Sequence, residues 1–295
     1  MELSIKTLES SDEKVWDDVV FSSTHGTIFH TIDWLKIEWR RMVQMQPDTE
    51  FLPLMFYKGS NLVAIYPIFT LKKGLIKVAL SPPPRSKMLF LGPVIAGYDS
   101  LKQEKKESRY IKVQESLDHY IFQEKACKYA KINTSPGLYD SRPLSWAGYA
   151  VNPLYTYRID LTKGIQAMWD NLDRHLRGNI NKAMQAGVTV REGDKEDLLF
   201  VLDSVLKRYL EQNIKMENYK DYLLDIYTRF YPDNLKIFVA EHRDRPIGGV
   251  IDIHFKNIMY GWMGLTKTTL NGISVNDLIQ WEVIKAAQKT AISLV

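Results

Sequence analysis

Three consecutive apolar segments in the second half of the chain, joined by very short polar turns, constrain its fold more than any other feature. They span residues 235–240, 246–255 and 258–264, and the turns are residues 242–245 and 256–257. Segments of this length that are rich in Val, Ile, Phe and Tyr are typical of strands, and turns this short join antiparallel neighbours. The pattern predicts a three-stranded antiparallel meander.

Helical patterns flank this meander on both sides. Before it, helices are predicted over residues 165–186 (with one break), 194–206 and 219–230. Asp194 suits the N-cap of the second of these helices. After the meander, Ser274 and Asp277 form a capping-box pattern ahead of a helix that ends near residue 289, and residues 291–295 begin a further strand.

The first half repeats this order. A helix is predicted from Thr31, followed by strands over residues 51–57, 62–70, 75–80 and 88–95, a helix from residue 102, and short elements near residues 132, 143–146 and 155–161. Residues 58–61 form a hairpin turn, and three consecutive prolines stiffen the loop 81–86. The boundary falls near Asn152, which gives a first domain of residues 1–151 and a second of residues 152–295.

The composition excludes several classes of protein. A chain of 295 residues has room for about two domains, and its net charge of +4 is too small to indicate nucleic-acid binding by itself. Because Cys127 is the only cysteine, disulfides and cysteine-rich zinc sites are excluded. His25 and His30 lack metal-ligand spacing with any carboxylate pair, so no metal is predicted. With no apolar run of about 20 residues and no signal peptide, we predict a cytoplasmic protein without a membrane span.

Several stretches of the sequence resemble the FemAB-like (FemABX) aminoacyltransferases. The similarity is strongest in the segment His-Gly-Thr-Ile-Phe-His-Thr-Ile-Asp-Trp-Leu-Lys at residues 25–36. The others are residues 91–94, 157–161, 174–188, 236–241, 261–264 and 278–281. Together they extend over nearly the whole chain, in the family's order.

This resemblance implies an α/β fold of two tandem acetyltransferase-type (GNAT-like) domains with mixed sheets. Members of the family transfer an amino acid from aminoacyl-tRNA to the amine of a peptidoglycan precursor, and more distant members are GNAT-like acyltransferases. The family usually continues into an Asp-Leu-Gly-Gly strand and a basic segment that helps bind the donor. Since neither follows residue 295, the second domain is expected to be shortened at its C-terminus. The coiled-coil arm of some members is also missing.

The candidate catalytic residues lie in the meander. No Ser-His-Asp or Cys-His arrangement is visible, which favours direct attack of an amine on the donor over a covalent intermediate. Asp252 and His254 are two residues apart on a predicted strand and therefore face the same side. They are candidates to relay the proton of the amine, the alternative being a polar, solvent-facing edge of the sheet. Tyr260 is a candidate donor to the leaving group.

Two groups of residues are candidates for binding the acyl donor. Arg174, Arg177 and Lys182 lie on one predicted helix and would hold phosphates of a tRNA acceptor end, a nucleotide sugar or coenzyme A, unless they form only a solvated face. The second group, by the resemblance to GNAT folds, is the loop and helix start that contain Gly272, Ser274 and Asn276. A helix N-terminus favours anions there, the alternative being an ordinary capped loop.

The acceptor is expected in the first domain. The family resemblance matches Lys36 to a lysine beside the acceptor site, and Trp34 to a wall or core residue next to it. Lys36 and Arg85 would offer two cations to an anionic acceptor in a shared cleft.

These inferences converge on an acyltransferase with no tightly bound cofactor. It would use aminoacyl-tRNA or acyl-CoA as co-substrate and a small-molecule or cell-wall-precursor-like amine as acceptor. The alternative is a catalytically inactive GNAT-like protein that only binds a ligand.

Overall fold

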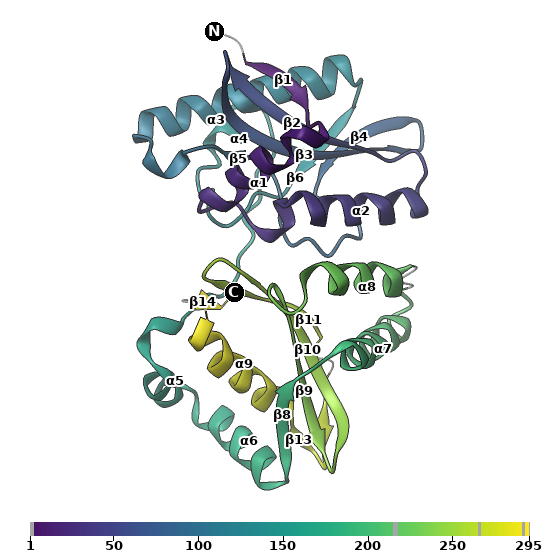
Figure 1. Ribbon diagram of the computed structural model, residues 1–295, viewed down its shortest axis with the longest axis vertical. Coiled ribbons are helices and arrows are strands. Elements are labelled where there is room, and N and C mark those ends of the chain that lie inside the picture. The colour runs from purple at the N-terminus through teal and green to yellow at the C-terminus, as the bar shows by residue number, and fades with distance from the viewer. Residues whose placement is uncertain (1–2, 215–217, 265–266, 291–292, 295) are drawn as a thin grey trace. The chain divides into compact units, whose positions relative to one another are not determined.

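The strands of the chain form two large mixed sheets, one in each of two structural units (Figure 1). The computed structural model describes residues 3–214, 218–264, 267–290 and 293–294. Unit 1 is Met1–Leu154 and unit 2 is Tyr155–Val295, so the division lies close to the boundary expected near Asn152. None of the helices in these described ranges is long and apolar enough to cross a membrane.

The sheet of unit 1 has the order β1-β2-β3-β4-β6. The first four strands pair antiparallel, β6 is parallel to β4, and the short β5 pairs with β3. The strands are β1 (Ser4–Thr7), β2 (Glu50–Lys58), β3 (Asn61–Lys73), β4 (Ile76–Ser81), β5 (Val94–Ile95) and β6 (Tyr129–Ile132).

Helices pack on the sheet of unit 1 through apolar side chains. Its helices are α1 (Glu13–Ser22), α2 (Ile32–Met45), α3 (Gln103–Asp118) and α4 (Arg142–Trp146), and a π-helix, His119–Glu124, continues α3. Leu54 and Tyr66, on one face of β2 and β3, belong to the same core cluster as Tyr110 and Val113 of α3. Because strand side chains alternate between faces, this cluster accounts for one face of the sheet.

The sheet of unit 2 has the order β7-β14-β11-β10-β9-β8. The meander β9-β10-β11 is antiparallel, as the sequence predicts, and β14 runs parallel to β11. The strands are β7 (Ile159–Asp160), β8 (Val188–Glu192), β9 (Leu235–His242), β10 (Arg245–Phe255), β11 (Ile258–Gly264) and β14 (Ser293–Leu294), and a separate hairpin is formed by β12 (Thr269–Leu270) and β13 (Ile273–Ser274).

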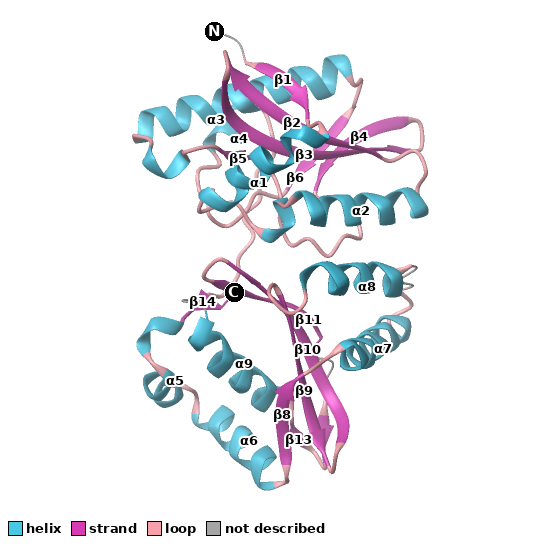
Figure 2. Cartoon of the chain, viewed as in Figure 1, coloured by secondary structure: helices cyan, strands magenta, loops and turns pink. Residues whose placement is uncertain are grey.

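The helices of unit 2 lie on both faces of its sheet, with α6 and α9 on one face and α7 and α8 on the other (Figure 2). They are α5 (Ile165–Asn171), α6 (Arg174–Gln185), α7 (Lys195–Glu211), α8 (Tyr219–Phe230) and α9 (Asn276–Thr290). The expected break between residues 165 and 186 is thus present, between α5 and α6. Val250 of β10 and Met259 of β11 share a core cluster with Ile279 and Trp281 of α9.

Both units run through the same sequence of elements. In unit 1 it is β1, α1, α2, β2, β3, β4, α3 and β6, and in unit 2 it is β8, α7, α8, β9, β10, β11, α9 and β14. In both, the last strand is parallel to the third strand of the meander. The repeat expected from the order of apolar segments is therefore real.

Three expected elements differ from the structure. Of residues 88–95, only Val94–Ile95 form a strand, because Leu91 instead donates its N–H to the carbonyl of Asn133 and the next residues are Gly92 and Pro93. Of residues 155–161, only Ile159–Asp160 pair with a neighbour. The helix expected after Ser274 begins at Asn276, since Ser274 is still paired within the β12–β13 hairpin.

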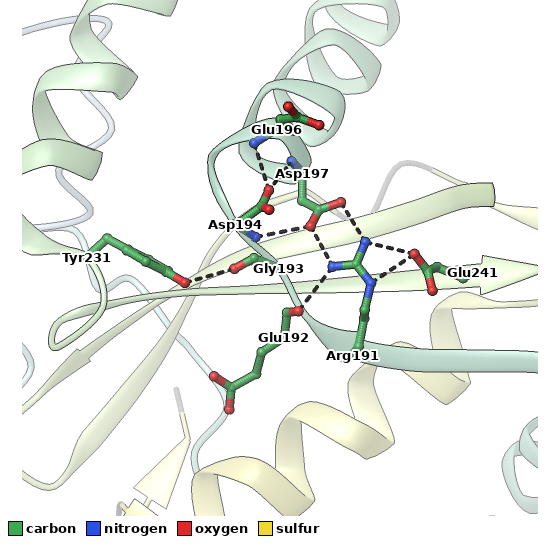
Figure 3. A network of polar contacts seen from close by, with 8 residues as sticks. All are labelled: Arg191, Glu192, Gly193, Asp194, Glu196, Asp197, Tyr231 and Glu241. Carbon is green, nitrogen blue, oxygen red and sulfur yellow. Dashed lines mark hydrogen bonds and ion pairs between the residues drawn. The ribbon is translucent and has the colours of Figure 1, made fainter. Parts of the chain in front are cut away.

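A network of polar side chains ties β8, β9 and the start of α7 together (Figure 3). Arg191 donates to Asp197 at 2.6 and 3.1 Å and to Glu241 at 2.8 Å. Asp194 and Asp197 form a capping box at the start of α7. Burial alone would raise the pKa of Asp197, but hydrogen bonds from Arg191 and the Asp194 N–H outweigh burial and hold that pKa below its usual range.

Replacing the central carboxylate of this network tests how much the network contributes to the stability of unit 2. Asp197→Ala removes both hydrogen bonds to Arg191 and half of the capping box, so we expect the free energy of unfolding to fall by about 2 kcal/mol in urea titrations at pH 7. Glu196→Ala is the matched control, because the Glu196 side chain is exposed and only its backbone N–H takes part. Equal losses in the two variants would show that the network does not stabilise the fold.

Candidate functional site

The third strand of the meander in unit 2 carries one residue more than its partner. Ile251 of β10 pairs with Met263, but the next residue, Asp252, pairs with Gly261, which leaves Trp262 as the extra residue of a β-bulge. Bulges redirect side chains and local backbone groups, and they are frequent next to active sites. The bulge places the backbone N–H of Trp262 against the side chain of Asp252.

Asp252 is a carboxyl group buried on the face of the sheet that α9 covers. It is 2% exposed, and Val250, on the same face of β10, lies in the core cluster with α9. One hydrogen bond reaches it, from the Trp262 N–H, while Oδ2 is buried and has no hydrogen-bond partner among the described residues. Burial raises the pKa of Asp252 to about 7, against a smaller opposite effect of the Trp262 N–H. The alternative of a solvent-facing edge therefore does not hold for Asp252.

His254 lies on the same face of β10 as Asp252, as the two-residue spacing predicts. Its backbone exchanges hydrogen bonds with Asn234, at 2.8 and 2.9 Å. Its ring Nε2 is buried and has no hydrogen-bond partner in the described part of the chain. Two polar atoms that could accept or pass a proton, Oδ2 of Asp252 and Nε2 of His254, thus belong to neighbouring positions of one strand face.

Tyr260 is placed on the other face of the sheet. It pairs directly with Ile253, so its side chain points to the side opposite Asp252 and His254. It is 4% exposed, and burial raises the pKa of its hydroxyl to about 12, with Arg158 acting in the opposite direction. The structure therefore brings together two of the three predicted catalytic residues and separates Tyr260 from them.

The predicted donor-binding loop forms the β12–β13 hairpin and the start of α9. Asn271 and Gly272, with φ of 49° and 80°, are the two central residues of the hairpin turn. The positive φ alone explains the glycine at position 272. Lack of space is not the reason, because a side chain there would meet no atom within 4 Å. Ser274 ends the hairpin, and Asn276 opens α9 with an Oδ1 that is buried and unpartnered among the described residues. Ser274 and Asn276 therefore flank a helix N-terminus.

One side of the basic helix α6 contacts the start of α9. Asn179 donates to Oδ2 of Asp277, the second residue of α9, at 2.7 Å. At 100° per residue, Arg177 lies about 160° around α6 from Asn179, and Arg174 lies about 140° around. Lys182 is only about 60° from Asn179. Lys182 therefore lies at a smaller angle than the two arginines from Asn179, the residue of α6 that contacts the start of α9, whereas Ile180 and Ala183 face the core shared with α9.

The three predicted acceptor residues of unit 1 make separate contacts. Trp34 is fully buried and packs edge-on against Phe29 at 5.1 Å. Lys36 forms an exposed ion pair with Glu13 of α1 at 2.7 Å. The loop at Arg85 is instead held from another side of α2, about 140° away, where Arg41 donates to the Arg85 carbonyl at 3.0 Å. No contact between Lys36 and Arg85 is described, and their shared cleft stays a prediction.

The sequence did not lead us to the ion pair that holds this loop. Glu38 and Arg41 are paired, and both are buried, at 0% and 4% exposure. Their spacing from Trp34, four and seven residues, places them on the apolar side of α2, a signal that could have been used. Among the described residues, no group of three or more His, Cys, Asp or Glu side chains could hold a metal ion.

Comparisons with known proteins agree with the repeated architecture. Residues 171–295 match the family described as acetyltransferase (GNAT) domain. No curated protein matches the chain by sequence. The chain is similar to a crystal structure of FemX, with a TM-score of 0.67 at 12% identity over 99% of this chain and 87% of FemX.

Two further solved structures are similar over most of both chains. A tandem GNAT protein from the clavulanic acid biosynthesis pathway gives a TM-score of 0.52 at 12% identity, over 99% of this chain and 89% of that one. The C-terminal domain of a putative lysylphosphatidylglycerol synthetase from Agrobacterium fabrum gives a TM-score of 0.51 at 14% identity, over 97% of this chain and 77% of that one. These likenesses confirm the predicted fold class, an α/β chain of two tandem GNAT-like domains.

The burial of Asp252 predicts an unusual pH dependence of stability. Its folded pKa of about 7 lies above the ordinary value near 3.9, so the folded state keeps a proton that the unfolded state loses. The contribution of Asp252 to stability therefore falls as the pH rises from about 4 to 7 and is constant above. Asp252→Asn should be more stable than the natural protein by roughly 2–4 kcal/mol at pH 8, with the difference vanishing near pH 4.

The control for this measurement is Asp203→Asn, because Asp203 is exposed on α7. Urea titrations at a series of pH values should show the same pH dependence for this variant and the natural protein. A difference between Asp252→Asn and the natural protein that does not change with pH would mean that Asp252 titrates normally.

Proposed function

We propose that this chain is an acyltransferase of the GNAT type in which Asp252 is the general base. It would move an acyl group from acyl-CoA or an aminoacyl-tRNA to an amine, in the manner of the FemAB-like enzymes. The observation that carries the proposal is a buried carboxyl group beside a bulge of β11, with a pKa of about 7 and one oxygen that has no partner among the described residues. A base with a pKa near the working pH combines a sufficient ionised fraction with sufficient proton affinity.

The reaction would proceed by direct attack. The amine nitrogen forms a bond to the acyl carbonyl carbon, and the bond from that carbon to the donor breaks, a C–S bond in acyl-CoA or a C–O ester bond in aminoacyl-tRNA. The nitrogen loses a proton to Asp252, and the leaving thiolate or ribose oxygen gains one. His254 shares the strand face of Asp252 and would pass that proton onward, whereas Tyr260 lies on the other face and is not assigned a step.

The two candidate donors would use different parts of unit 2. The N-terminus of α9, with Ser274 and Asn276, offers the backbone N–H groups of a first helical turn to a compact diphosphate such as that of coenzyme A. Lys182 lies closer than the two arginines to the side of α6 that contacts the start of this helix. Arg174 and Arg177 lie elsewhere on α6 and suit a donor that extends over the surface, such as a tRNA acceptor end.

The acceptor is proposed to be an amine on a small molecule or a cell-wall-precursor-like compound. This assignment rests on the resemblance to the FemAB-like family and on the likeness to the FemX fold. Within unit 1, Lys36 and Arg85 are the cations proposed for acceptor binding, and a separate variant of each would test them.

The role of Asp252 is tested by the pH dependence of acyl transfer. With acetyl-CoA or aminoacyl-tRNA and a panel of amines, kcat/KM of the natural protein should rise with pH through an apparent pKa near 7. Asp252→Asn should lower kcat by roughly 10²–10⁴-fold and remove this rise. Asp203→Asn should leave both unchanged. An unaltered profile in Asp252→Asn would exclude Asp252 as the base, and tight donor binding without any turnover would favour a binding protein.

A variant of Arg174 and Arg177 distinguishes the two candidate donors, tRNA and coenzyme A. Arg174→Glu/Arg177→Glu should weaken tRNA binding and lower its salt dependence by about one unit of slope for each phosphate that is no longer neutralised. Coenzyme A binding should not change, because the α9 N-terminus is on another side of α6. The matched control is Lys207→Glu/Arg208→Glu on α7. Unchanged affinity and salt slope in the α6 variant would show that this helix face is only solvated.

A further inference from the structure

The tip of the β3–β4 hairpin projects from the sheet of unit 1. β2 pairs with β3 only as far as Thr70, and β6 pairs with β4 only from Val78. Between these limits the two strands pair with each other as a ribbon closed by Gly74 and Leu75, and Leu71, the Lys72 carbonyl and Lys77 contact the rest of unit 1. Leu71 is buried against Met42 of α2, whereas residues 72–76 at the end of the ribbon are exposed.

Large apolar side chains at this tip are turned to solvent. Leu75 is 107% exposed, the highest value among the exposed large apolar side chains of the described residues, and Ile76 is 42% exposed. Tyr129, at the start of the neighbouring β6, is 51% exposed. Single exposed leucines are common on protein surfaces, but here three large side chains lie along one end of the sheet, and none of them contributes to a core.

Lysines surround these apolar side chains, and we name the whole set the hairpin patch. It consists of Leu75, Ile76, Tyr129, Lys72, Lys73, Lys77, Lys125 and Lys128. Lys128 is tied to the ribbon by a backbone hydrogen bond to the Lys77 carbonyl at 2.8 Å. Lys72 and Lys77 are direct cross-strand neighbours, an unfavourable like-charge pair, and are offset by Asp48 and Glu50. Lys73 and Lys128 have no ion-pair partner among the described residues.

We propose that the hairpin patch docks the protein on an anionic lipid bilayer. An exposed apolar tip enters the boundary between headgroups and acyl chains, and lysines beside it lie at the level of the negatively charged headgroups. Long lysine side chains extend their charged ends toward the headgroups while their stems cover apolar surface. A nucleic acid would use the lysines but would leave Leu75 and Ile76 in water, so the fully exposed leucine favours the bilayer.

Vesicle cosedimentation tests the proposal with the full chain. We expect binding to vesicles of phosphatidylglycerol and phosphatidylcholine in equal amounts, and at least tenfold weaker binding to phosphatidylcholine alone. Leu75→Ser should weaken binding to the anionic vesicles roughly tenfold, since the apolar side chain that enters the bilayer is removed. Lys73→Gln/Lys128→Gln should weaken it roughly fivefold for each charge removed, and less so in high salt. All the residues changed are exposed, and thermal unfolding verifies that the variants remain folded.

Two matched controls distinguish the patch from general properties of the chain. Leu210→Ser removes an exposed leucine from α7, and Lys105→Gln/Lys112→Gln removes two charges from α3. Both should bind vesicles like the natural protein. Equal losses in control and patch variants, or no binding to anionic vesicles, would overturn the proposal. The proposal would also be overturned if the lysines of the patch bound tRNA and Leu75→Ser had no effect on that binding. It would equally be overturned if the protein were a dimer that Leu75→Ser dissociates.

Discussion

The account of unit 2 depends on one extra residue in one strand. Without the bulge at Trp262, β11 would pair with β10 in uniform register. The backbone N–H groups of β11 would then be directed to the neighbouring strands and would not reach a side chain. The bulge instead directs the Trp262 N–H to the carboxyl group of Asp252. That single hydrogen bond is less than an ionised carboxylate needs, and the apolar surroundings under α9 supply no more, so the pKa rises.

Asp118, a partly buried carboxyl group of unit 1, is satisfied by side chains in a way that Asp252 is not. In unit 1, Asp118 accepts hydrogen bonds from the Tyr149 hydroxyl at 2.6 Å and from Gln114 at 2.9 Å. Burial raises the pKa of Asp118, and these two hydrogen bonds act against burial. Asp252 has no side-chain partner of this kind among the described residues. A buried polar atom left without a partner is costly to stability and is therefore more often found where it serves chemistry.

Much of the fold could be predicted because it follows from local patterns. Apolar segments of strand length joined by short turns predicted the meander, and the two-residue spacing placed Asp252 and His254 on one face. The bulge could not be predicted, since Trp262 differs in no chemical respect from an ordinary strand residue. The burial of Asp252 and its pKa depend on how α9 packs over β10, which is a tertiary property. That Arg41 holds the loop at Arg85 could not be predicted either, because this contact joins residues far apart in the sequence.

The most direct test of the account is a titration of the Asp252 carboxyl group itself. The carboxyl carbon of Asp252 can be followed by NMR in protein labelled with ¹³C at aspartate side chains, with Asp252→Asn used to assign its resonance. The account predicts a midpoint near pH 7. A midpoint near 4, the ordinary value for aspartate, would contradict it, since Asp252 would then be ionised throughout the neutral range and would be a poor base.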